Sequence, residues 1–330
     1  MSKNPSNPNT APPTGASVSN KPMVYLLFAI LFGSLFSVTL KVCQRWQIDT
    51  QQVILFNYAS AFIITLIPLL FRLTGPGGSI PVQDFILSKA SVGACVLQGI
   101  LFLAGFSIMD RATWHCGVAL TTAAARASLI LPVLLSWILL AQPAPSWLAV
   151  GLILLSMALI VLPAEDEEPA SVGGTDKDRR RKAIIALIAV FIAFGLSDFT
   201  LKLAQHSVDR VSAGDPVLMG RQLDALTCTI FLMATLAGLV VCLVTGSFRK
   251  HKVTWRSLLG GLALGVINIV CTSCALKALG VLATGTFYPL YNIGIVILAT
   301  LIGVLFFKEK LKWLQVAGLV LAIAAIALAF

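Results

Sequence analysis

Long apolar segments constrain this chain more than any other feature of its sequence. Of its 330 residues, 58% are hydrophobic and 12% are charged, whereas soluble domains carry about 25% charged residues. A bilayer crossing takes about 20 mostly apolar residues, so these segments predict a polytopic membrane protein. The same composition excludes a soluble globule, a disordered chain and a disulfide scaffold. The net charge of +10 does not predict nucleic-acid binding, because the basic residues mostly cap apolar segments.

Ten apolar segments are long enough to cross a bilayer. Before them, residues 1–22 are rich in Pro, Ser and Asn and predict a disordered tail. In the middle of the chain, residues 164–181 are acidic first and basic last, which is typical of a linker. The expected spans are residues 23–43, 52–71, 89–109, 117–140, 146–163, 182–204, 216–244, 255–277, 280–307 and 311–330.

The two sides of the linker repeat each other. Thr-Leu-Lys with Gln three residues later ends both the first segment, at 39–44, and the sixth, at 200–205. Matching residues stay between about 161 and 167 positions apart across all five segment pairs, which indicates duplication. Five crossings are an odd number, so the second repeat is inverted relative to the first. The predicted fold class is therefore all-α integral membrane, with ten transmembrane helices as two inverted five-helix repeats over 23–163 and 182–330.

Three stretches of the sequence form a recognisable pattern. They are Gly33, Phe36 and Lys41 in the first segment, Phe287-Tyr288-Pro289-Leu290 in the ninth, and Phe306-Phe307-Lys308-Glu309-Lys310-Leu311 with Trp313, Gln315 and Gly318 at the end. Over roughly residues 23–330 the chain resembles the EamA-type transporters of the drug/metabolite transporter superfamily. It departs from that family at Gln142-Pro143, where the family usually has an acidic residue. The resemblance implies a ten-helix carrier that moves small metabolites by alternating access, without ATP.

The motifs of several enzyme classes are missing from the sequence. It contains no phosphate-binding Gly-rich loop ending in Lys-Ser/Thr, no His-Glu-x-x-His pair and no Gly-x-Ser-x-Gly elbow. The three histidines lie near helix ends, and Cys271-x-x-Cys274 lies in an apolar helix, where packing is the favoured role. We therefore expect a protein that is not an enzyme, with no catalytic residue, no metal site and no cofactor.

The expected partners follow from the transporter interpretation. They are the lipid bilayer and a small-molecule metabolite, anionic or zwitterionic, with a coupling ion or proton, and we expect no nucleic acid. The sequence leaves open whether the protein is a monomer or a homodimer. It has no permissive N-x-Ser/Thr acceptor and no organelle retrieval signal, so a multi-pass protein of the plasma (inner) membrane is expected.

Arg126 is the foremost candidate for contact with a substrate. It lies about 3 Å along the axis from the centre of the 117–140 segment, too deep to reach the headgroups easily. The matching region of the ninth segment holds Tyr288, Tyr291 and Asn292, which places aromatic and amide side chains opposite the cation. A structural ion pair for Arg126, and core or interface packing for the tyrosines, are the alternatives.

Other polar side chains lie at membrane depth. Asn57, Tyr58, Gln98 and Asn268 are candidate substrate contacts, although hydrogen bonds between helices are the default for such groups. The secondary candidates are Lys41, Lys202, Asp198 and Arg221.

The secondary candidates lie where pairing or snorkelling competes with substrate binding. Lys41 and Lys202 are each about 12 Å from a segment centre, so snorkelling to the headgroups is favoured. Asp198 precedes Lys202 by four residues, so the two are expected to pair, and Arg221 is expected to pair with Asp224. This pairing leaves Arg126 and Lys41 without an anion inside the membrane, which suits a substrate carboxylate or phosphate.

The sequence leaves two alternatives open, one for the side of the membrane on which the termini lie and one for the class of function. Of the 24 Lys and Arg residues, six fall on the side of the termini and fourteen on the other, which by the positive-inside rule places the termini outside. The family resemblance implies termini in the cytoplasm. For function, a channel or an intramembrane enzyme remains the alternative to a carrier, with Asp110 and His115 the nearest approach to a catalytic pair.

Overall fold

In this computed structural model the described residues are 21–45, 49–74, 81–116, 118–161, 176–250, 252–307 and 312–329, and within these ranges they form helices and no strand. The helices are α1 (Lys21–Arg45), α2 (Thr50–Thr74), η1 (Val82–Phe85), α3 (Lys89–Cys116), α4 (Val118–Ala127), α5 (Ile130–Leu139), α6 (Trp147–Val161), α7 (Asp176–Ser212), α8 (Pro216–Thr245), α9 (Ser247–Lys250), α10 (Trp255–Leu279), α11 (Thr284–Phe307) and α12 (Trp313–Ala329).

Within the described residues, eight segments are long and apolar enough to cross a membrane. Large apolar side chains such as Phe71 and Val244 are exposed on their outer surface, as expected where lipid is the solvent. The protein is therefore built as a helical, multi-pass membrane protein. The other two expected spans correspond to α6 and α12, which are shorter apolar helices, so the count of ten stays a prediction.

The expected span 117–140 is one crossing made of two helices. α4 ends at Ala127 and α5 begins at Ile130, although the region counts as a single apolar span, Thr121–Leu139. Pro132 has no N–H to continue the α-helical ladder. The carbonyl of Ser128 instead accepts from the N–H of Leu131 at 2.9 Å, which is a tighter i→i+3 bond. This crossing is therefore discontinuous near its middle.

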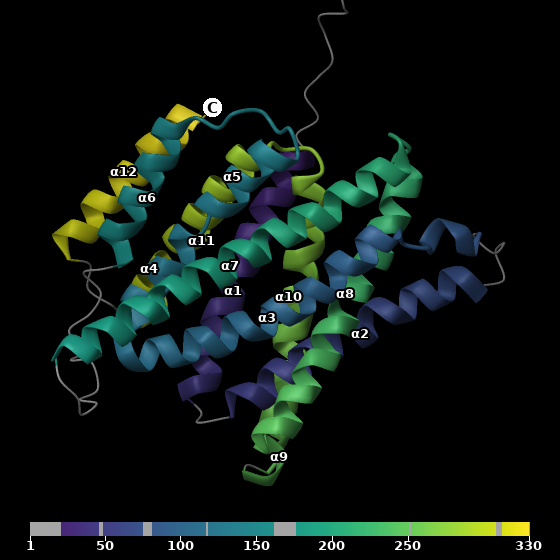
Figure 1. The fold of residues 1–330 in the computed structure, drawn as a ribbon, viewed down its shortest axis with the longest axis horizontal. Coiled ribbons are helices and arrows are strands. Elements are labelled where there is room, and N and C mark those ends of the chain that lie inside the picture. The colour runs from purple at the N-terminus through teal and green to yellow at the C-terminus, as the bar shows by residue number, and fades with distance from the viewer. Residues whose placement is uncertain are drawn as a thin grey trace, which may run out of the picture.

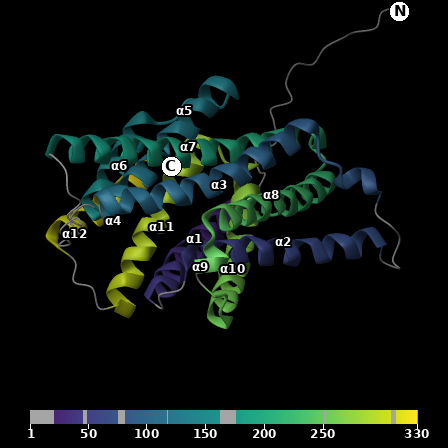
Figure 2. The same ribbon diagram turned by 60° about the horizontal axis from the view of Figure 1, so that its bottom comes forward.

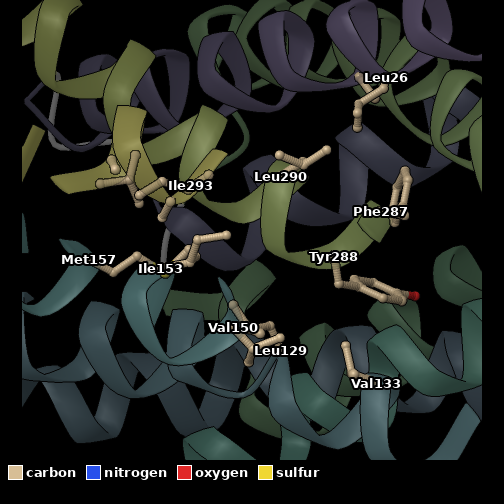
Figure 3. Close-up of a cluster of buried hydrophobic side chains, with 14 of the residues drawn as sticks. Leu26, Leu129, Val133, Val150, Ile153, Met157, Phe287, Tyr288, Leu290 and Ile293 are labelled. Atoms are coloured by element: carbon tan, nitrogen blue, oxygen red, sulfur yellow. The ribbon is translucent and has the colours of Figure 1, made fainter. Parts of the chain in front are cut away.

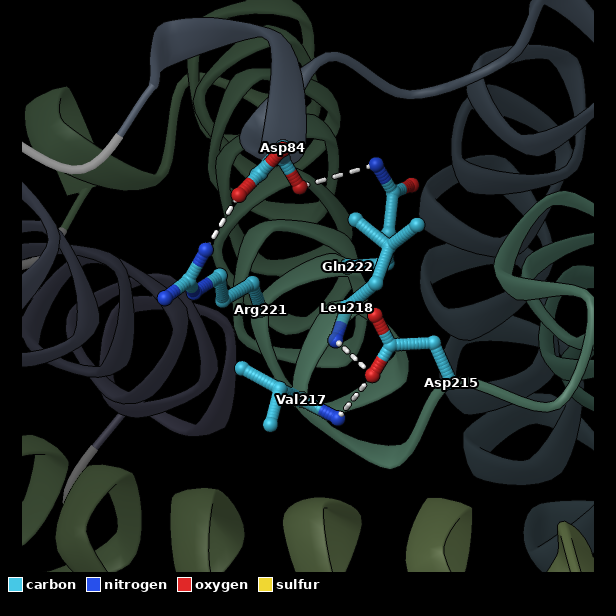
Figure 4. Close-up of polar contacts among 6 residues, drawn as sticks. All are labelled: Asp84, Asp215, Val217, Leu218, Arg221 and Gln222. Carbon is cyan, nitrogen blue, oxygen red and sulfur yellow. Dashed lines mark hydrogen bonds and ion pairs between the residues drawn. The ribbon is translucent and has the colours of Figure 1, made fainter.

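Helix α7 is longer than the expected 182–204 and ends in a tight turn. Ala213 and Gly214 both have positive φ, 46° and 88°, which reverses the chain into α8. The side chain of Asp215 then caps α8 by accepting hydrogen bonds from the backbone N–H groups of Val217 and Leu218 (Figure 4). The capped turn fixes the direction in which α8 leaves α7.

Helices from the two sequence halves pack against each other throughout the bundle. α3 lies along α7 and α8, α1 and α2 lie along α10, and α6 lies along α12 (Figures 1 and 2). The backbone contact between α10 and α2 is close, because a Cβ at Gly261 would lie 2.3 Å from Phe56 Cβ. Gly261 and Gly265 therefore allow close contact between two helices of one chain.

A large apolar cluster joins α1, α6 and α11 to the broken crossing. Leu129 and Val133 lie below Tyr288 of α11, with Val150 and Ile153 of α6 beside them (Figure 3). This packing holds the region of the break against α11. It thereby positions Arg126, three residues before Leu129, next to the polar residues of α11.

Candidate functional site

Arg126 lies in the last turn of α4, immediately before the break. Its Nη1 donates a hydrogen bond to Oδ1 of Asn292 on α11 at 3.2 Å. Asn292 is 4% exposed, and its amide nitrogen donates to the backbone carbonyl of Tyr288 at 3.0 Å, which fixes the orientation of the amide. The expectation that Arg126 faces the polar residues of the ninth segment is confirmed.

Asp198 on α7 is the anion that Arg126 faces. The two side chains interact electrostatically, and the hydroxyl of Tyr288 donates to the backbone carbonyl of Asp198. This corrects the expectation that Arg126 has no acidic partner inside the membrane. Among the described side chains, however, no nitrogen of Arg126 and oxygen of Asp198 come within 4.0 Å. The pair is opposed across a gap and not in contact.

The side chains of Arg126 and Asp198 are both partly exposed. Arg126 and Asp198 both lie inside apolar spans, yet neither is fully buried. Burial of a lone charge in a low-dielectric interior is costly, so an opening at this depth lowers the cost of keeping both side chains ionised. The site is therefore a polar, accessible region enclosed by helices.

Tyr291 forms a second side of the site, together with α10 and α1. Its hydroxyl lies 3.3 Å from Sγ of Cys271, which also approaches the carbonyl of Ala29 at 3.5 Å. At Gly33, a Cβ would come within 3.3 Å of the Tyr291 hydroxyl, so glycine leaves room for this ring. Sequence reasoning assigned Cys271 to packing only, and nothing in its spacing points to the contact with Tyr291.

Gln98 brings a hydrogen-bonding group from α3 to the same region. Its Nε2 donates to Oγ of Ser197, the neighbour of Asp198, at 2.8 Å. The residue is fully buried, and its Oε1 has no hydrogen-bond partner among the described residues. A buried polar atom without a partner costs about 1–3 kcal/mol, so this oxygen is a candidate acceptor for a ligand.

Asn57 and Asn268 form a short polar chain between α2 and α10. Asn268 Nδ2 donates to Oδ1 of Asn57 at 3.3 Å, and Thr272 Oγ1 donates to Oδ1 of Asn268 at 3.2 Å. Nδ2 of Asn57 is buried without a hydrogen-bond partner in the described part of the chain. Both asparagines therefore link helices, and Asn57 retains a free donor.

Tyr58 differs from the other candidates because it packs in an apolar cluster. It is 1% exposed and stacks on Phe102 at 5.7 Å, with Phe231 at 6.5 Å between ring centroids. These contacts support the packing alternative for this tyrosine. They place it between α2, α3 and α8, away from the contacts made by Arg126.

Lys202 does not extend to the headgroups as expected. It is 3% exposed, and its Nζ donates to Oε1 of Gln205 at 2.8 Å and to the carbonyl of Leu279 at 2.7 Å. The expected pair with Asp198 is therefore wrong, because the side chain turns toward α10 and the end of its own helix. The side chain of Lys41, its expected counterpart in the first half of the sequence, lies outside the described residues.

The expected pair of Arg221 with Asp224 is also wrong. Arg221 forms an ion pair with Asp84 of η1, and Asp224 forms one with Arg72 at the end of α2. Gln222 adds a hydrogen bond from its Nε2 to the backbone carbonyl of Asp84 at 2.9 Å (Figure 4), and another to the backbone carbonyl of Ile86 at 3.1 Å. These contacts attach the short 3₁₀ helix to the start of α8, so Arg221 has a structural role.

Metal binding has no support within the described ranges. They hold no group of three or more His, Cys, Asp or Glu side chains placed to bind a metal ion. The side chains of Asp110 and His115 lie outside the described residues.

The known proteins that are similar to this chain match most of its length. No family model matches it. An uncharacterized protein of Haemophilus influenzae (strain ATCC 51907 / DSM 11121 / KW20 / Rd) is 27% identical over 303 residues, which are 91% of this chain and 95% of that protein. A protein of known crystal structure is similar with a TM-score of 0.63 and 14% identity, over 93% of this chain and 96% of that one. The structural similarity extends to the fold alone.

Proposed function

We propose that the protein is a secondary transporter that moves a small metabolite through its centre by alternating access. The observation that carries this proposal is the opposed pair of Arg126 and Asp198, which lies inside apolar spans, is partly accessible and makes no contact ion pair. Ionisable side chains at this depth are costly, and they mark substrate or ion pathways in membrane proteins.

The proposed architecture is a ten-helix bundle of two inverted five-helix repeats, in the manner of the EamA-type transporters. The eight long spans, together with α6 and α12, supply enough helices, and each half packs against the other. In transporters with inverted repeats, substrate sites lie near the midplane where discontinuous helices meet. The α4–α5 break provides irregular backbone, and Pro289 in the facing helix α11 lacks the N–H that would satisfy a carbonyl of the preceding turn.

The charges of the site favour a zwitterionic substrate over a simple anion. Arg126 supplies a fork of donors that suits a carboxylate, whereas the carboxylate of Asp198 repels a second negative charge and attracts an ammonium group. The unpartnered Oε1 of Gln98 and Nδ2 of Asn57 supply an acceptor and a donor for the remaining polar atoms of the substrate. Transport is driven by the gradient of the substrate, an ion or protons.

The first experiment is a thermal-shift panel on purified protein, followed by flux measurements. The panel covers amino acids, organic acids, nucleosides, sugars and cationic drugs, and we expect the largest stabilisation from a zwitterion. Proteoliposomes then separate a carrier from a channel, because a carrier gives saturable counterflow with the stabilising compound. Ohmic conductance without counterflow would contradict the proposal.

The orientation of the termini is tested separately. We propose termini in the cytoplasm of a plasma-membrane protein, as the family resemblance implies, against the count of basic residues. Reporter fusions at the C-terminus and within residues 165–178 distinguish the two orientations, because the reporters are active on only one side of the membrane.

A further inference from the structure

A second polar region lies at one membrane end of the bundle, away from Arg126. A cavity of about 320 Å³ lies among the last turns of α7, the start of α3 and the end of α5. Its lining is partly apolar, through residues such as Leu139, Leu140 and Val211. The remaining lining is polar, through Ser88, His206 and Arg210, so the cavity combines hydrocarbon and cationic surfaces.

Two basic side chains of α7 are available to a ligand in this cavity. His206 and Arg210 are four residues apart, so they share one face of the helix. Nε2 of His206 is buried and has no hydrogen-bond partner among the described residues. Arg210 is exposed, and within the described ranges no carboxylate lies within 4.0 Å of its guanidinium. Both side chains line the cavity, and within the described residues neither forms an ion pair with a carboxylate.

The neighbouring polar groups of α7 are already bonded. Lys202 donates to Gln205 and to the carbonyl of Leu279, and Gln205 donates to Oδ2 of Asp209 at 2.8 Å. Ser207, which also lines the cavity, shares a hydrogen bond of 2.7 Å with Ser91 of α3. Asp209 accepts from Gln205 and keeps its negative charge, but it is not one of the residues that line the cavity, whose only charged lining residue among those described is Arg210.

The position of the cavity along the membrane normal matches a lipid headgroup. The α7 span ends at Ser212, the α3 span begins at Lys89 and the Thr121–Leu139 span ends beside it, so three spans reach the interface here. Leu139 is 62% exposed on the outer surface, which places hydrocarbon contact next to the cationic residues. A bilayer lipid has its phosphate and its acyl chain at these two levels.

We propose that this cavity binds the phosphate of an anionic phospholipid, with Arg210 and His206 as donors and an acyl chain along Leu139, Leu140 and Val211. The positive charge of Arg210 matches a phosphate, and the apolar lining distinguishes a lipid from free phosphate. The proposed lipid site requires that the protein lies in a bilayer, and it is independent of which substrate is transported.

The test compares three ligands on the full chain in detergent. Phosphatidylglycerol, phosphatidylcholine and inorganic phosphate are added separately, and the unfolding midpoint and the retained lipid, by native mass spectrometry, are measured. We expect stabilisation and retention with phosphatidylglycerol only. For Arg210→Gln we expect retention about fivefold to tenfold weaker, because each Lys or Arg near an anionic surface contributes about 1 kcal/mol.

Two further variants make the result specific. Arg181→Gln is the matched control, because Arg181 is exposed near the start of the span on the same helix and should retain phosphatidylglycerol like the wild type. Ala90→Phe fills the cavity from an exposed position of α3 and should weaken retention without loss of folding. Equal retention of phosphatidylcholine, equal stabilisation by inorganic phosphate, or equal losses in Arg181→Gln and Arg210→Gln would each overturn the proposal.

Discussion

Two arginine–aspartate pairs in this protein differ in whether their side chains are in contact. Arg221 and Asp84 are in contact at a membrane end, with side chains 28% and 25% exposed. Arg126 and Asp198 lie inside apolar spans, where desolvation makes contact pairing more necessary, and yet they remain apart. The outer pair therefore stabilises the fold, whereas under the proposed function a substrate binds between the charges of the inner pair.

The helices that carry the two arginines also differ. Arg221 and Gln222 belong to α8, a continuous and capped helix, and all their contacts fix η1 in place. Arg126 precedes a helix break, and the only hydrogen bond of its guanidinium within the described residues is the 3.2 Å bond to Asn292. The guanidinium therefore has further N–H donors that are free to bind a ligand.

The largest effect is expected for Arg126→Gln. Loss of a charged donor to a desolvated carboxylate costs about 2–5 kcal/mol, so counterflow should fall by about thirtyfold or more. The unfolding midpoint should stay near that of the wild type, since no contact ion pair is broken. Initial rates in proteoliposomes measure the effect, and unchanged binding and uptake of every anionic and zwitterionic compound would contradict it.

A smaller effect is expected for Asp198→Asn. This variant keeps the backbone carbonyl that accepts from Tyr288 and removes only the negative charge. Transport of the zwitterion should fall about tenfold through weaker binding, since one charge-assisted hydrogen bond becomes a neutral one. Relative uptake of the matching simple anion should rise, and a parallel fall for both compounds would show that Asp198 does not contact the substrate.

The backbone at the break is tested by Gly195→Ala on α7. A Cβ there would lie 2.5 Å from Leu131 Cδ1 and 2.9 Å from the carbonyl of Ser128. We expect destabilisation of about 1–3 kcal/mol and reduced transport, because α7 must move away from the broken crossing. Gly151→Ala is the control, with open space at its Cβ, and equal effects of both changes on the unfolding midpoint would refute the close packing.

The smallest effects are expected at the outer pairs. Arg221→Gln should lower stability by about 1–2 kcal/mol and leave the transport rate per folded molecule unchanged. Arg72→Gln, whose pair with Asp224 is 49% and 44% exposed, should cost less than about 1 kcal/mol. Thermal unfolding in detergent measures both, and a transport defect in folded Arg221→Gln would remove the contrast between the two regions.

The spans were predictable because bilayer thickness fixes the length of an apolar segment. Arg126 and its approach to Asn292 were also predictable, because depth and the repeat spacing single them out. The break at 128–129 was missed although Pro132 signals it, since the apolar run continues through it.

The partners of Asp198, Lys202 and Arg221 could not be read from the sequence. Spacing of three or four residues favours local pairs, whereas helix packing brought in Arg126, Leu279 and Asp84 from distant segments. Contacts between helices depend on their rotation and crossing, which apolar periodicity leaves undetermined in a lipid-facing bundle.

The central claim is tested most directly by a thermal-shift panel run in parallel on the wild type, Arg126→Gln and Arg221→Gln. We expect that at least one zwitterionic compound stabilises the wild type and Arg221→Gln, and fails to stabilise Arg126→Gln. Equal stabilisation of Arg126→Gln by that compound, or stabilisation by cationic drugs alone, would contradict it.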